Sequence, residues 1–231
     1  MQNNDKNYNS ALNLCENNFS HDELIDFLKN GDIVQKQYAA LNIDILKSSE
    51  EAKTFISNLV GVDGKIREVV AIKLIDFTND YPKLFHNPEI FENFVKATID
   101  IDGNVCRCVI LSAFNLIMYD DFTKYYTNGL IKIIDEALCE LKKITYKDKK
   151  YKTNKQIFKI YWALESLILF IQKIKLADIK RILKECSIIQ DYVIREKCAQ
   201  IIVKIDLDEE LSIIIDKLKS DSNYYVRNVF K

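Results

Sequence analysis

The chain has 231 residues, of which 48% are hydrophobic and 29% are charged, a balance that excludes wholesale disorder. Only 5 glycines and 2 prolines are present, which disfavours a turn-rich β-sandwich and favours helices with short connections. The net charge of −1 is unevenly distributed, because residues 1–141 carry 13 basic and 22 acidic side chains and residues 142–231 carry 20 and 12.

Residues 1–20 begin with a polar stretch that does not have the pattern of a secretory signal. We expect them to form an N-terminal extension, partly flexible or folded as a short helix. No apolar run approaches the roughly 20 residues that span a bilayer. The six cysteines also lack disulfide or zinc-ribbon spacing, so we expect a cytoplasmic protein with no membrane contact.

Hydrophobic periodicity predicts six pairs of helices between residues 21 and 231. In chain order the pairs are 21–30 with 33–47, 48–60 with 64–78, 88–100 with 104–118, 121–143 with 153–174, 177–188 with 191–205, and 208–219 with 223–231. The start of each second helix carries a recurring phrase, an acid or amide followed by an aliphatic residue and, in most copies, an arginine.

The spacing of this phrase indicates a repeat architecture. Its aliphatic position falls at Val34, Ile66, Val105, Ile157, Ile194 and Val226, with intervals of 32, 39, 52, 37 and 32 residues. The longest interval contains a lysine-rich segment, 142–155, which we interpret as an insertion. Periods near 35 to 45 residues with two helices each are typical of an α-solenoid.

The phrase resembles the HEAT-repeat (armadillo-like) family, in which an aspartate ends the inter-helix turn and a Val-Arg pair opens the second helix. The resemblance covers residues 21–231 and is clearest at 63–75 and 190–205. It implies an all-α fold, a right-handed α-solenoid of about six HEAT-like helix pairs, in one repeat domain. It says little about activity, because such folds host many roles.

The charged residues of the phrase have two interpretations. They form a structural ladder that joins neighbouring repeats, or their arginines grip an acidic ligand; we favour the ladder. The predicted ladder residues are Asp63, Arg67, Asp102, Arg107, Asp191, Arg195 and Arg227.

Two further features are candidate partner-binding sites. The lysine-rich segment interleaves tyrosines with basic residues, which suits acidic protein surfaces or phosphate backbones. The helix after it carries an aromatic side stripe, with Trp162 as a possible anchor if second helices line the concave surface. A solvated loop and a buried stripe are the alternatives. The candidate residues are Phe158, Trp162, Glu165, Lys147, Lys149, Lys150 and Lys152.

The sequence offers no catalytic centre. Its two histidines, His21 and His86, lie far apart in the repeat order, and Cys106 and Cys108 point about 200° apart on a helix, so we expect no metal site and no cofactor. The sequence also contains no phosphate-binding loop or dinucleotide motif.

We therefore expect a non-enzymatic scaffold or adaptor that binds another protein, one with an acidic surface, through the concave face and the basic insertion. The alternative is a HEAT-like DNA-binding protein or alkylated-base DNA glycosylase, which the acidic remainder of the chain disfavours. A lyase, a chaperone for a cofactor-bearing partner, and a toxin-neutralising or regulatory protein are compatible but not selected. The opposite charges of the two halves allow a monomer or weak self-association.

Overall fold

The computed structural model describes residues 11–144, 149–206 and 208–231, and these residues form helices and connections without any strand. The chain divides into two compact units, Met1–Phe122 and Thr123–Lys231. The boundary falls inside a helix, α8 (Asp120–Lys143). The sequence predicted a single repeat domain from residue 21 onward.

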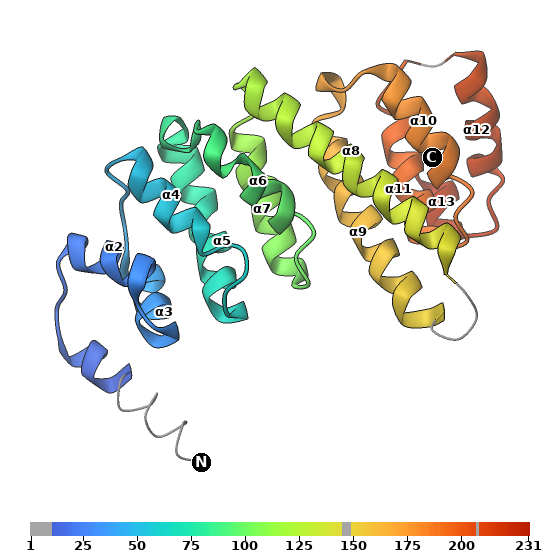
Figure 1. The fold of residues 1–231 in the computed structure, drawn as a ribbon. Coiled ribbons are helices and arrows are strands. Elements are labelled where there is room, and N and C mark those ends of the chain that lie inside the picture. The colour runs from blue at the N-terminus through green and yellow to red at the C-terminus, as the bar shows by residue number, and fades with distance from the viewer. Residues whose placement is uncertain (1–10, 145–148, 207) are drawn as a thin grey trace. The chain divides into compact units, whose positions relative to one another are not determined.

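Unit 1 contains three pairs of helices, preceded by a short helical turn at residues 11–16 (Figure 1). The pairs are α2 (His21–Asn30) with α3 (Ile33–Asn42), α4 (Ser49–Ser57) with α5 (Gly64–Asp80), and α6 (Phe91–Ala97) with α7 (Gly103–Asn115). Two 3-10 turns, η1 (Pro82–Phe85) and η2 (Pro88–Ile90), precede α6. Residues 1–10 of the expected extension lie outside the described residues.

Unit 2 also contains three pairs. They are α8 with α9 (Lys149–Leu169), α10 (Leu176–Cys186) with α11 (Tyr192–Ile202), and α12 (Glu209–Lys219) with α13 (Tyr224–Asn228). A 3-10 turn, η4 (Ile171–Lys173), follows α9. In both units the second helices of successive pairs pack side by side: α5 lies between α3 and α7, and α11 lies between α9 and α13. The exposed side of this layer is called the second-helix face below.

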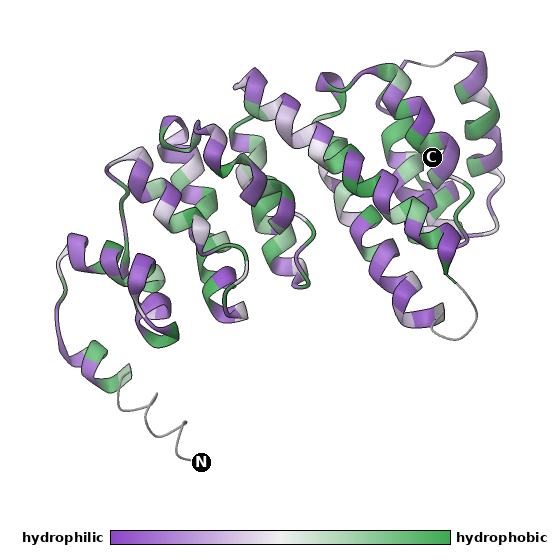
Figure 2. Cartoon of the chain, viewed as in Figure 1, coloured by the Kyte–Doolittle hydropathy of each residue, from purple (hydrophilic) through white to green (hydrophobic). Residues whose placement is uncertain are grey.

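The prediction of an all-α helical-repeat fold with six pairs is confirmed for the described residues. The helices are amphipathic, and Figure 2 shows hydrophilic and hydrophobic residues alternating along them, as expected where one side of each helix is buried. Large aromatic residues fill the cores. In unit 1, for example, Phe122 packs edge-on against Phe91 and Phe94, with ring centroids 5.1 and 5.2 Å away.

Two predicted boundaries differ from the structure for physical reasons. The helix expected over 33–47 ends at Asn42, because the chain becomes extended at Ile43 and buries Ile43 and Leu46 in that form. These two apolar residues, which the sequence assigned to the helix, therefore belong to a buried connection. The helix expected over 88–100 begins as the 3-10 turn η2, with Pro88 in its first position. Among the described residues, no helix combines the length and apolar character needed to cross a membrane.

Candidate interaction surface

Each second helix whose start is described begins at a capping side chain. Asp63, Asp102 and Asp191 accept hydrogen bonds from the backbone N–H groups two residues later, and Asn223 does the same. These bonds satisfy N–H groups that have no partner inside the helix. The acidic residues of the recurring phrase are therefore N-caps, which explains why an aspartate or asparagine is needed there.

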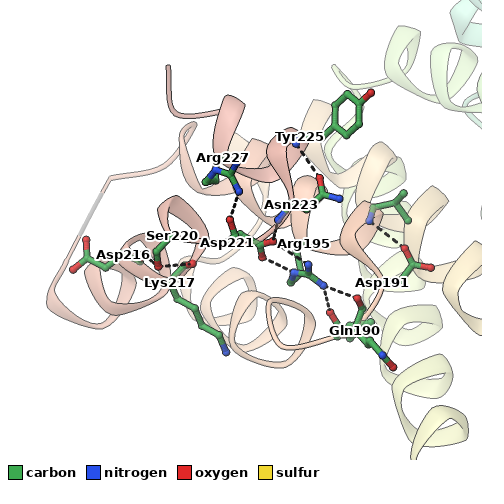
Figure 3. A network of polar contacts seen from close by, with 12 residues as sticks. Gln190, Asp191, Arg195, Asp216, Lys217, Ser220, Asp221, Asn223, Tyr225 and Arg227 are labelled. Carbon is green, nitrogen blue, oxygen red and sulfur yellow. Dashed lines mark hydrogen bonds and ion pairs between the residues drawn. The ribbon is translucent and has the colours of Figure 1, made fainter.

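The arginine four residues after the cap joins its own turn to the next pair of helices. In unit 1, Arg67 donates to Asp100 from Nε at 2.8 Å and from Nη2 at 3.2 Å, and to the carbonyl of Val62 at 2.5 Å. In unit 2, Arg195 donates to Asp221 at 2.6 and 3.0 Å and to the carbonyls of the preceding turn (Figure 3). The arginines thus contact carboxylates that lie two residues before the next cap.

The charge environment of Asp221 is set mainly by Arg195. The two side chains are 9% and 14% exposed, and the hydrogen bonds from the guanidinium lower the pKa of the Asp221 carboxyl. Asp221 also accepts the backbone N–H of Asn223, and its carbonyl accepts from Arg227 at 2.5 Å. Figure 3 shows these contacts converging on one turn between α12 and α13. This arrangement leaves little surface of either charge for a ligand.

One member of the expected ladder is placed differently. Arg107 lies five residues after its cap and donates to Asn104 on its own helix at 3.0 Å. Cys106 occupies the equivalent position instead, and its thiol donates to the carbonyl of Asp100 at 3.1 Å. In the first pair the donor is Lys36, which reaches Asn58 Oδ1 at 3.1 Å. In the described pairs a hydrogen-bond donor occupies this position, and arginine, lysine and cysteine each fill it.

Within the described residues α9 begins at Lys149, four residues before the expected start at 153, and the lysine-rich segment is partly helical. Its first two residues end α8, and 149–155 form the first turns of α9, where Lys150 and Lys152 are exposed and Tyr151 is 77% exposed. Lys147 and the side chain of Lys149 lie outside the described residues. Lysine is a good helix former, so a basic composition is compatible with a continuing helix.

Trp162 was a candidate anchor, and the structure places it in the core. Its side chain is only 8% exposed, and its ring packs edge-on against Tyr161 at 5.2 Å and Phe158 at 6.2 Å between ring centroids. An indole buried to this extent offers little surface to a partner. Phe158 and Tyr161 are half-buried, and Tyr151 near the start of α9 is exposed.

Glu165 is also engaged within the unit. Its carboxylate lies 2.5 Å from the ammonium of Lys197 on α11, whose side chain is 10% exposed. The same ammonium donates to Gln200 at 3.0 Å and lies 5.0 Å from the centroid of the Tyr161 ring. A nearly buried lysine with a carboxylate and an aromatic face has its charge balanced internally. The pair therefore fixes α9 against α11 and orients Tyr161.

The sequence reasoning missed a set of exposed tyrosines at the starts of α11 and α13. Tyr192 on α11 stacks on Tyr225 of α13 with centroids 6.0 Å apart, and Tyr225 meets Tyr224 edge-on at 5.7 Å. Tyr192, Tyr224 and Tyr225 are 37%, 54% and 57% exposed. We call Tyr192, Tyr224 and Tyr225 the tyrosine face. The signal in the sequence was a tyrosine directly after the caps Asp191 and Asn223.

Each of the two histidines is paired with one carboxylate. His86 is hydrogen-bonded to Asp121 at 2.8 Å, and His21 is hydrogen-bonded to Glu51 at 2.9 Å. Each bond links segments that belong to neighbouring helix pairs. No group of three or more histidine, cysteine or acidic residues in the described part of the chain has the arrangement of a metal site. Burial raises the pKa of the Cys106 thiol to about 12, which removes it as a nucleophile at neutral pH.

Comparison with known proteins gives fold-level similarity alone. No family model matches the sequence, and no curated protein matches it. An engineered protein solved by a structural genomics consortium is 15% identical, with 92% of this chain and 96% of that chain covered and a TM-score of 0.47. A second engineered protein is 11% identical over 90% of this chain and 92% of its own, with a TM-score of 0.46.

A designed armadillo repeat protein is similar to the same degree. It is 11% identical, with 91% of this chain and 96% of that chain covered and a TM-score of 0.44. These values carry no argument about activity or partners. The caps, the cross-turn hydrogen bonds and the packing of helix pairs in each unit define the helical-repeat architecture.

Proposed function

We propose that the protein is a non-enzymatic, protein-binding scaffold whose recognition surface is the tyrosine face of unit 2, supplemented by the basic start of α9. The observation that carries this proposal is the stacking of exposed Tyr192 on Tyr225, continued by Tyr224. These rings are held in place before any partner arrives. Pre-organised side chains lose little conformational entropy on binding.

Tyrosine suits protein recognition because it offers a large, rigid contact area and a hydroxyl for hydrogen bonding. Aromatic residues of this kind dominate the binding energy of many protein interfaces. The exposed lysines at the start of α9, Lys150, Lys152 and Lys155, add positive charge to unit 2. Such charges accelerate the encounter with an acidic partner and favour one orientation.

Nucleic-acid binding, including a base-excising activity, is the alternative function. Binding to DNA needs many lysines or arginines that are free to replace counterions on phosphates. Several lysines of unit 2 are instead paired with carboxylates: Lys132 with Glu136, Lys142 with Glu185, and Lys143 with Glu140. This internal pairing favours a protein partner, and the experiment below separates the two.

The test compares the full chain with a double variant, Tyr192→Ala with Tyr225→Ala, in capture of proteins from nuclease-treated extract of the source cells. The matched control is Ile213→Ala, which removes a 71% exposed side chain elsewhere in unit 2. We expect the captured protein to be lost with the double variant and retained with the control. A captured set that is identical for all three proteins would contradict the proposal.

A gel-shift series with DNA and RNA completes the experiment. Submicromolar binding that weakens steeply between about 50 and 200 mM salt would support the nucleic-acid alternative and overturn the scaffold proposal. Weak binding without sequence preference agrees with the scaffold. Circular dichroism of each variant shows whether the helices are intact.

A further inference from the structure

Unit 1 has an exposed apolar row on its second-helix face, separate from the surface proposed above. Leu41 on α3, Ile72 on α5, and Leu111 and Phe114 on α7 are 53%, 52%, 44% and 41% exposed. We call these four residues the apolar row. Single exposed apolar side chains are ordinary, but four on three adjacent helices indicate a surface that a partner covers.

Hydrogen bonds between the helices fix the alignment of this row. Lys73 of α5 donates to the carbonyl of Ile43, just after α3, at 2.6 Å. Asn115 of α7 donates to the carbonyl of Ile75 at 3.1 Å and to Thr78 at 3.1 Å. Ile72 precedes Lys73 directly and lies one turn before Ile75. Leu41, Ile72 and Leu111 therefore lie at similar heights on three neighbouring helices.

Negative charge borders the apolar row on the side of the helix C-termini. Asp44, which is 89% exposed, lies beyond Leu41, and the exposed Asp76 and Asp80 follow Ile72 on α5. Lys73 offsets part of this charge, because its ammonium is 3.5 Å from Asp44. Unit 1 as a whole carries 19 acidic and 11 basic side chains, a net charge of −8.

The opposite border has a different character. Near the helix N-termini, Lys65 is 74% exposed and lies 3.7 Å from Glu68, while the exposed Arg107 lies one turn before Leu111. The face is therefore polarised, with an apolar centre, an acidic border and a weakly basic border. A ligand with one basic and one apolar side can fit this surface in one orientation.

We propose that unit 1 binds an amphipathic helix of a partner protein, with the apolar side of that helix on the apolar row and lysine or arginine residues against Asp76 and Asp80. Neighbouring helices lie about 8–10 Å apart, and seven residues of a helix span about 10.5 Å. Three apolar residues spaced by seven, in a helix of about 15 residues lying across α3, α5 and α7, therefore match the row.

The probes are two synthetic peptides of about 16 residues with leucines in the same amphipathic pattern. One carries lysines beside the apolar side, and the other carries glutamates at those positions. Fluorescence anisotropy measures the binding of each labelled peptide to the full chain. We expect the lysine peptide to bind at least about tenfold more tightly, because only its flank complements the acidic border.

Variants of the full chain test the residues individually. Ile72→Gln should weaken binding of the lysine peptide about tenfold, and Asp76→Lys should reverse the preference between the two peptides. The matched control is Ile101→Gln, since Ile101 is 87% exposed in the turn before α7 and lies outside the row. The double variant of the tyrosine face should bind the peptide normally, so this proposal and the proposed function succeed or fail separately.

Three results would overturn the proposal. Equal affinity for the two peptides, or no binding of either, would refute the proposal that the partner is a basic amphipathic helix. Unchanged binding by Ile72→Gln would remove the apolar row as its site. Sedimentation without peptide that shows a dimer lost in Ile72→Gln would show that a second copy of this chain covers the row.

Discussion

The ion pair between Arg195 and Asp221 should be worth measurable stability in unit 2. Replacing Arg195 with methionine removes two hydrogen bonds to Asp221 and two to backbone carbonyls, and it leaves the 9% exposed carboxylate without its cation. Breaking a fully buried pair costs about 3–5 kcal/mol. This pair lies at a turn, where solvent screens part of the charge. We therefore expect Arg195→Met to lower the free energy of unfolding by about 2 kcal/mol.

Urea unfolding followed by tryptophan fluorescence measures this loss. Trp162 is the single tryptophan of the chain and is buried in unit 2, so its emission reports the unfolding of that unit. Asp221→Asn and the double variant complete a thermodynamic cycle, in which we expect a coupling of about 1–2 kcal/mol. Arg107→Met is the control. Its guanidinium contacts Asn104 on its own helix, so a change within about 0.5 kcal/mol is expected.

The pair also predicts a dependence on pH. Arg195 lowers the pKa of Asp221 from its ordinary value of 3.8, so the native state holds the proton less tightly than the unfolded state. The stabilisation is therefore complete above that ordinary value and is lost as the pH falls through the lower native pKa. Coupling that is absent at pH 7, or equal losses for Arg195→Met and Arg107→Met, would refute this reasoning.

Three further predictions concern the core, a cap and the thiols. Trp162→Ala should lower the free energy of unfolding by about 3–5 kcal/mol in thermal or urea melts, and an unchanged melt with lost partner binding would restore its role as an anchor. Asp191→Ala removes an N-cap and should cost about 1 kcal/mol, whereas Asp191→Asn should cost little. Mass spectrometry of the native protein treated with iodoacetamide at pH 8 should show Cys15 and Cys139 alkylated, because they are exposed, while Cys106, with a pKa of about 12, reacts only after urea is added.

The repeat architecture could be predicted because capping and helical periodicity are local. An aspartate at a turn and apolar residues at intervals of three and four define a helix start from neighbouring residues alone. The acceptor of each arginine could not be predicted in this way. Arg67 and Asp100 are 33 residues apart, and the recurring phrase contains other carboxylates that lie closer in sequence.

The surface residues were harder to predict for a related reason. A second helix is covered on one side by its own pair and on both flanks by neighbouring second helices, so little of it is exposed. Trp162 lies on a covered flank of α9, while Tyr192 and Tyr225 lie on the open side. Periodicity distinguishes apolar from polar sides, but it does not say which neighbour reaches which flank. The early start of α9 at Lys149 was also missed, because the residues before 153 lack the apolar periodicity that marks a helix, although helix formation needs no apolar residue at every turn.

The hydrogen-bond donor four residues after each cap also explains how the amino-acid sequence of this chain can differ from the pattern of a known repeat. Arginine, lysine and cysteine occupy that position in different pairs, and each has a backbone carbonyl of its own turn within reach. A change from one to another can shorten the reach toward the next pair while the carbonyl keeps its hydrogen bond. Geometry at these turns can thus persist through substitutions that erase a recognisable signature.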